Sequence, residues 1–179
     1  NWASFEHICD GAIRTKAEFT YDAIEVDGLK YSVSRTLELD ANSYFVKHTT
    51  TFLPIGHDTE LISVALGAVK HDIVHRENGS HWIAYTEKAS DTRTPDKDGN
   101  ISIALVYDPD AREENIFMAV GDNGVHASII SAEETGKPIT TWTGSSWSHA
   151  EIKTGEEWAD TVRNFSYHIS NPLTVSIIE

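Results

Sequence analysis

The sequence predicts an all-β fold, an antiparallel β-sandwich with one C-terminal amphipathic α-helix. Three observations favour it. Short segments of alternating apolar and polar residues fill residues 1–147, hairpin-type turn residues separate several of them, and one helix is clearly signalled near the end. A length of 179 residues suits one domain with its own core, so we expect residues 1–179 to form a single β-sandwich domain.

The clearest strand is residues 31–39, where every second residue from Tyr31 to Leu39 is apolar except Arg35. Two-residue turns between alternating segments are expected at Asp27-Gly28, Asn78-Gly79 and Asn123-Gly124. Further strands are expected at residues 13–21, 44–53, 61–70, 73–76, 82–85, 101–107, 116–120, 125–130, 139–143 and 173–178. The polar residues 88–100 are expected to form a mobile loop.

A helix is expected to begin after Thr154, because Thr154-Gly-Glu-Glu157 is a capping box. Apolar residues then recur at helical spacing from Trp158 to Ile169, and Asn171-Pro172 ends the segment. One such helix among many antiparallel strands predicts that it packs on one surface of the sandwich.

Charge and composition exclude some functions. The chain has 14 basic and 28 acidic residues, a formal net charge of −14, which argues against non-specific binding to nucleic acids. Apolar runs are too short to cross a bilayer, so no membrane association is expected. The chain opens on Asn1 and its only methionine is Met118, which indicates a mature, trimmed or fragmentary chain. Cys9 is the only cysteine, so no internal disulfide is expected.

Basic residues interrupt the apolar pattern of three strands that we expect to be neighbours. Arg35, His48 and Lys70 each stand where alternation predicts an apolar side chain. Lys70 and His71 end the apolar strand that begins at Leu61. Each of the three could reach water at a strand end or belong to a buried ion pair. If they converge, they form an anion site in an acidic protein.

A carboxylated sugar such as a uronate suits that anion site. Arg35 can bind the carboxylate through two hydrogen bonds, and Lys70 supplies a point charge. Neutralising the carboxylate also acidifies the neighbouring C–H bond, which favours β-elimination. His48 or His71 could then act as the base, and Tyr85 as the acid.

Aromatic residues offer a second signal for sugars. Trp82 and Trp147 could stack on sugar rings as substrate-binding residues, although core packing is the commoner role of tryptophan. His71 and His75 resemble a zinc-protease pair, but in a strand they lie about 13 Å apart, too far for one ion. A weak calcium option rests on Asp91, Asp96 and Asp98, whose spacing departs from the known loop. We therefore expect no metal and no cofactor.

Several short stretches together resemble one bacterial family, the domain-of-unknown-function family 4861. They are residues 25–31, 47–50, 67–71, 137–140, 144–147, 156–158 and 171–173. The resemblance implies a large β-sandwich of the carbohydrate-active type and an association with polysaccharide degradation. Because family members are generally longer, it also implies that this chain is their C-terminal part. His48, Lys70, His71 and Trp147 are supported by it only as motif positions.

Three functions remain open at this stage. The first is recognition, with cleavage by a lyase or hydrolase reaction as an option, of an acidic uronate-containing poly- or oligosaccharide by a secreted or periplasmic protein. The second is a non-catalytic sugar-binding module, which keeps the basic residues and Trp147 but needs no base. The third is a structural role, in which the chain completes a larger sandwich with a second chain or a missing N-terminal half.

Overall fold

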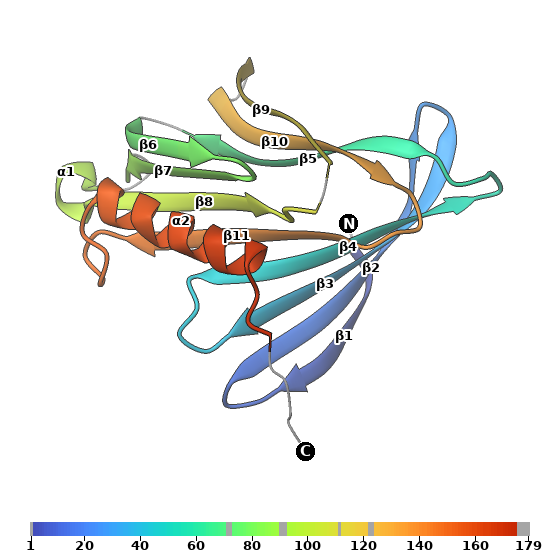
Figure 1. Cartoon of the computed structure of the whole chain (residues 1–179), viewed down its shortest axis with the longest axis horizontal. Coiled ribbons are helices and arrows are strands. Elements are labelled where there is room, and N and C mark those ends of the chain that lie inside the picture. The colour runs from blue at the N-terminus through green and yellow to red at the C-terminus, as the bar shows by residue number, and fades with distance from the viewer. Residues whose placement is uncertain (1, 71–72, 90–92, 111, 122–123, 175–179) are drawn as a thin grey trace.

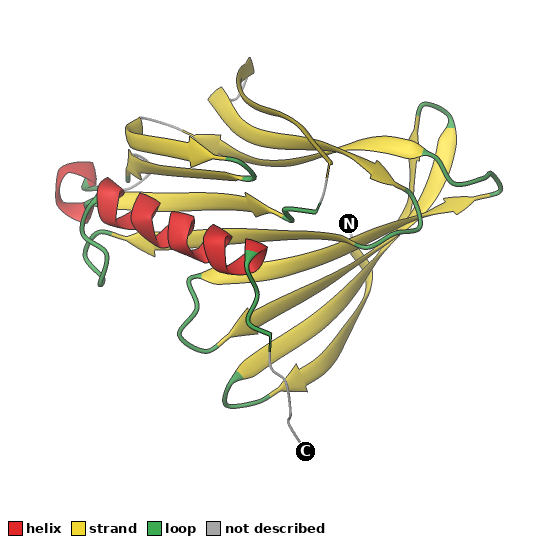
Figure 2. Cartoon of the chain, in the orientation of Figure 1, coloured by secondary structure: helices red, strands yellow, loops and turns green. Residues whose placement is uncertain are grey.

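The computed structural model contains two antiparallel β-sheets and one long helix, which confirms the all-β sandwich with a C-terminal helix (Figures 1 and 2). The structure describes all residues except 1, 71–72, 90–92, 111, 122–123 and 175–179.

The first sheet has eight strands in the order β1-β2-β3-β4-β11-β8-β7-β6, and each neighbouring pair is antiparallel. Its strands are β1 (Trp2–Asp10), β2 (Arg14–Val26), β3 (Leu29–Asp40), β4 (Phe45–Ile55), β6 (Ile73–Gly79), β7 (Trp82–Lys88), β8 (Asn100–Tyr107) and β11 (Ile139–Trp147). The second sheet has the order β5-β10-β9, with β5 (Leu61–Lys70), β9 (Arg112–Gly121) and β10 (Gly124–Glu134).

Two packed layers lie on opposite faces of the first sheet. Successive residues of each strand point alternately into one layer and the other. On β7, Ile83 and Tyr85 belong to a core cluster that includes Val64 and Leu66 of β5. Trp82 and Ala84 belong instead to the cluster under the long helix. We call the first side the inner face and the second side the helix-side face.

The helix α2 (Gly155–Ser170) covers β6, β7 and β8 on the helix-side face (Figure 1). Its capping box is present: Glu157 N donates to Thr154 Oγ1, and the Glu157 carboxylate accepts from Thr154 N. Asn171 is the C-cap, as the sequence predicts. None of the helices that the structure describes is long and apolar enough to span a membrane.

The Asp27-Gly28 hairpin is confirmed, because both residues have positive φ, 51° and 82°, as a type I′ turn requires. The turn expected at Asn78-Gly79 is wrong: these residues are the end of β6, and the chain turns at Ser80 and His81, where His81 takes a φ of 66°. Asn123 lies outside the described residues.

Three other expectations need correction. Strand β1 was missed because its residues WASFEHICD alternate poorly, and all nine are exposed. The segment 88–100 contains a short helix, α1 (Pro95–Asp98). Residues 173 and 174 lie outside any strand, and the rest of the strand expected at 173–178 lies beyond the described part of the chain.

Candidate functional site

Arg35 and His48 lie on the inner face of the first sheet, on the neighbouring strands β3 and β4. The register pairs Arg35 with Thr50 and Leu37 with His48, so Arg35 and His48 are diagonal neighbours on one face. Such diagonal neighbours have Cα atoms roughly 7–8 Å apart. The sequence expectation that these two residues share a face is therefore met.

Arg35 is half-buried, and the partners of its guanidinium among the described residues are neutral. Its Nε donates to Thr50 Oγ1 at 3.0 Å, and its Cζ lies 5.9 Å from the centre of the Tyr21 ring. Within the described residues, no carboxylate lies within ion-pair distance of Arg35. By contrast, Arg14 pairs with Asp40, and Arg163 pairs with Glu77 and Asp160.

The surroundings of His48 favour the neutral form of its imidazole. Burial lowers its pKa, and the positive charge of Arg35 lowers it further. Its Nε2 lies 2.8 Å from Thr143 Oγ1, a hydroxyl on the inner face of β11. A neutral imidazole keeps one nitrogen able to accept a proton or a hydrogen bond, which a protonated one does not.

We predict that the pKa of His48 rises in the Arg35→Gln variant, because the repelling charge is removed. The pKa should stay below about 6.5, the value of a free histidine, because burial is the larger cause. The depressed pKa of the folded state means that the stability from neutral His48 is complete above about pH 6.5 and is lost as the pH falls toward the folded pKa. NMR titration of the imidazole protons measures the shift. The matched variant Arg14→Gln should leave it unchanged, and an equal shift in both variants would refute the assignment.

A cavity of about 430 Å³ lies beside Arg35 on the same face. The register of β2 against β3 shifts between Tyr21 and Ile24, so Asp22 and Ala23 bulge out of the ladder there. The cavity walls are Tyr21, Asp22, Ala23, Ile24, Val33, Arg35 and Phe52. Mainly apolar walls with a few converging polar groups are typical of a small-molecule site.

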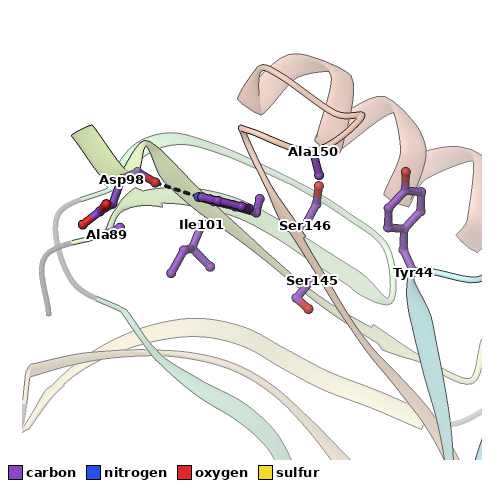
Figure 3. A pocket seen from close by; sticks show the side chains of 8 residues that line it. Tyr44, Ala89, Asp98, Ile101, Ser145, Ser146 and Ala150 are labelled. Carbon is purple, nitrogen blue, oxygen red and sulfur yellow. Dashed lines mark hydrogen bonds between the residues drawn. The ribbon is translucent and has the colours of Figure 1, made fainter. Parts of the chain in front are cut away.

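A second cavity, of about 770 Å³, lies at the far end of β11 (Figure 3). Trp147 is one of its lining residues. The Trp147 side chain is 49% exposed, and its Nε1 donates to the backbone oxygen of Asp98 at 2.6 Å. Ser145 and Ser146 lie between Asp98 and Tyr44 in this cavity (Figure 3).

Two expected site residues lie in the core. Tyr85 is 0% exposed on the inner face, and burial, followed by the nearby charge of Glu87, raises its pKa far above the ordinary value. Trp82 is 7% exposed, packs on the helix-side face, and has the Arg163 guanidinium 6.0 Å from its ring centre. Trp82 and Arg35 therefore lie on opposite faces of the first sheet.

Lys70 does not share a sheet with Arg35 and His48. It is the last residue of β5 in the second sheet, where it pairs with Val125, so the expectation that the three strands are neighbours is wrong. His71 lies outside the described residues, as does Asp91 of the calcium option. Within the described part of the chain, no three potential metal ligands cluster.

Sequence reasoning missed the neutral partners Tyr21, Thr50 and Thr143. Tyr21 could have been found, because it follows the alternation of residues 13–21 on the same face as Phe19. Thr50 and Thr143 could not, since their roles depend on the pairing of β4 with β3 and of β11 with β4.

Comparison with known proteins places the chain in a family. The model of the family "Domain of unknown function (DUF4861)" matches residues 1–175. The chain belongs to this family. The match lends no support to the expectation that it is only a C-terminal part of the family. No curated protein matches it.

The fold of this family member recurs in a solved structure described as "Putative kojibiose phosphorylase from human microbiome". The TM-score is 0.60 at 12% sequence identity, and the match covers 88% of this chain and 21% of that chain. At this identity the likeness shows the fold alone. The chain spans about a fifth of the length of that structure.

Proposed function

We propose that this domain recognises an acidic, uronate-containing carbohydrate on the inner face of the first sheet. The observation that carries the proposal is the half-buried Arg35, which has no carboxylate partner in the described residues although the chain carries a net charge of −14. A buried charge is costly unless it is paired, so a ligand carboxylate is a natural complement.

The surroundings of Arg35 suit a sugar. The cavity of about 430 Å³ has the Tyr21 ring and Phe52 as apolar walls, against which the C–H groups of a pyranose can pack. The exposed Asp22 side chain, which lines the same cavity, can accept hydrogen bonds from sugar hydroxyls. The structural neighbour is named for a sugar substrate, kojibiose, which agrees with a carbohydrate ligand.

The neutral state of His48 supports cleavage as a second candidate function. With the carboxylate neutralised by Arg35, His48 can take the proton from the adjacent carbon. The electron pair of that C–H bond forms the new C=C bond, the C–O bond on the next carbon breaks, and the departing oxygen receives the proton from His48. Tyr85 has no exposed surface, so this proposal does not use it.

Calorimetric titration with two matched oligosaccharides tests the proposal. One is a uronate oligomer and the other is the same oligomer with its carboxylates reduced to alcohols. The native chain should prefer the acidic form, and Arg35→Gln should weaken that binding about tenfold or more, since charge-assisted hydrogen bonds are lost. The variant Arg14→Gln removes the same charge from an existing ion pair and should bind normally.

Equal affinity for the two oligosaccharides, or no binding of either, would refute acidic-sugar recognition. Ultraviolet absorbance of the same mixtures distinguishes the two candidates, because β-elimination creates a new double bond. Binding without new absorbance would show that the domain is a non-catalytic sugar-binding module.

The proposed ligand also suggests where in the cell the protein acts. Acidic polysaccharides are met outside the cytoplasm, so a secreted or periplasmic protein of a polysaccharide-degrading system is the corresponding proposal. Immunoblots of cell fractions test it, and a purely cytoplasmic signal would contradict it.

A further protein partner is proposed for β1, a second chain or another part of the same protein. Its Trp2, Phe5 and Ile8 are exposed on a strand at the edge of the first sheet. Analytical ultracentrifugation tests this partner. The partner would be contradicted if the chain stays monomeric at high concentration and its sedimentation does not change when another part of the same protein is added.

A further inference from the structure

Trp147 presents a fixed aromatic ring to the cavity of about 770 Å³. The hydrogen bond from its Nε1 to the Asp98 backbone oxygen holds one edge of the ring. His149 stacks against one ring face, with the centres 4.8 Å apart and the planes 20° from parallel. Trp147 nevertheless remains 49% exposed, so part of its side chain is accessible to a ligand.

Tyr44 also lines this cavity, but it packs beside Trp158 and therefore bounds the cavity from the helix-side face. Its hydroxyl donates to the Glu151 carboxylate at 2.6 Å, which fixes the ring at the cavity edge. Ser145 and Ser146 lie between Tyr44 and Asp98 and point to opposite sides of β11 (Figure 3); Ser145 is exposed, whereas the Ser146 hydroxyl oxygen is buried. Aromatic surfaces beside hydroxyl groups fit a pyranose ring, which has apolar C–H faces and a polar rim.

Strand β11 connects this cavity to the Arg35 and His48 site. Thr143, Ser145 and Trp147 alternate with residues of the other face, so they follow one another along the inner face. Thr143 already contacts His48 Nε2, and Ser145 is exposed. The line therefore begins beside His48, the diagonal neighbour of Arg35, and ends at the cavity that Trp147 lines.

The length of this line determines the size of a ligand that would occupy it. Arg35 is level with Ile139 on β11, because both pair with Thr50, and Trp147 lies eight positions beyond Ile139, which at the strand rise corresponds to about 26 Å. A single pyranose cannot contact both ends, whereas an extended oligosaccharide can.

We infer that the domain binds an extended acidic oligosaccharide along β11, with one carboxylate at Arg35 and a more distant sugar ring on Trp147. The inference rests on the proposed function and adds to it a polymeric ligand and a second binding position. It explains why an exposed, immobilised tryptophan and a line of small hydroxyl residues occupy the same face as Arg35.

Titration with uronate oligomers of increasing length tests the inference. The native chain should gain about tenfold in affinity once the oligomer is long enough to reach Trp147. Trp147→Ala should remove this gain and leave the affinity for the shortest oligomers unchanged. Tyr167→Ala, which removes another exposed aromatic ring on α2, should keep the gain.

A second variant guards against a folding defect in Trp147→Ala. Ser145→Leu places a bulky side chain on an exposed position between the two ends and should also abolish the length-dependent gain. Thermal unfolding of each variant shows whether the fold is intact.

The outcomes separate the two proposals. If short and long acidic oligomers bind the native chain equally well and Arg35→Gln still weakens both, the extended site is wrong and acidic-sugar recognition stands. If the gain with length survives both Trp147→Ala and Ser145→Leu, the path along β11 is wrong. If no acidic oligomer binds at any length, both proposals fall.

Discussion

Replacing Trp158 by alanine should lower the free energy of unfolding by about 3–5 kcal/mol, the range for large aromatic residues in cores. Trp158 is 0% exposed at the centre of the interface between α2 and the first sheet. Its ring lies parallel to Phe45 at 5.8 Å and edge-on to Tyr44 at 6.0 Å, and its Nε1 donates to the Ile103 oxygen at 3.0 Å. The substitution creates a cavity and also leaves the Ile103 carbonyl without this donor.

Urea denaturation of the native chain and the variant measures the loss. Tyr167→Ala is the matched control, because Tyr167 is an aromatic residue of the same helix that is 62% exposed. The control should change the unfolding free energy by less than about 0.5 kcal/mol. A Trp158→Ala chain as stable as the control would contradict the packing of α2 on the first sheet.

Gly144→Val should destabilise the domain by about 1–3 kcal/mol, the usual cost of overpacking a core. Gly144 is the register partner of Phe45, and a Cβ at this position would lie 2.7 Å from the Phe45 ring. The ring cannot move aside easily, because Phe165 stacks on it with centres 3.7 Å apart and Trp158 lies parallel to it on the same cluster. The added side chain must therefore separate β11 from β4 or displace α2.

Thr140→Val is the control for that prediction. It introduces the same side chain on β11, on the same face as Gly144, in place of a residue of nearly equal size. Denaturation curves should place its midpoint close to that of the native chain and the midpoint of Gly144→Val well below both. Coinciding midpoints for the two valine variants would show that Phe45 has more room than the structure gives it.

Local patterns in the sequence were enough to predict the helix and several strands. The capping box fixed the start of α2, and the interrupted alternation of β3 placed Arg35 on an apolar face. These features depend on neighbours within four residues, which the sequence displays directly. The same alternation placed His48 correctly on β4.

Long-range pairing was not available from such patterns. Lys70 was expected on a strand neighbouring those of Arg35 and His48, yet the chain leaves the first sheet after β4, and β11 lies beside β4 instead of β5. The roles of Thr143 and Trp147 depend on that pairing of β11 with β4. Tyr85 and Trp82 were expected to contact a ligand. An aromatic residue in a strand can line a ligand site or pack in the core, and the sequence pattern does not distinguish these two positions.

The alternation of β4 and β11 also separates two kinds of constraint on this protein. Residues that hold α2 and residues that face the proposed ligand lie on opposite faces of the same strands, and substitutions without shared partners usually have additive effects. Inner-face positions such as Thr143 and Ser145 can therefore be randomised as a set to search for new ligand preferences, while the aromatic cluster under α2 keeps the scaffold folded.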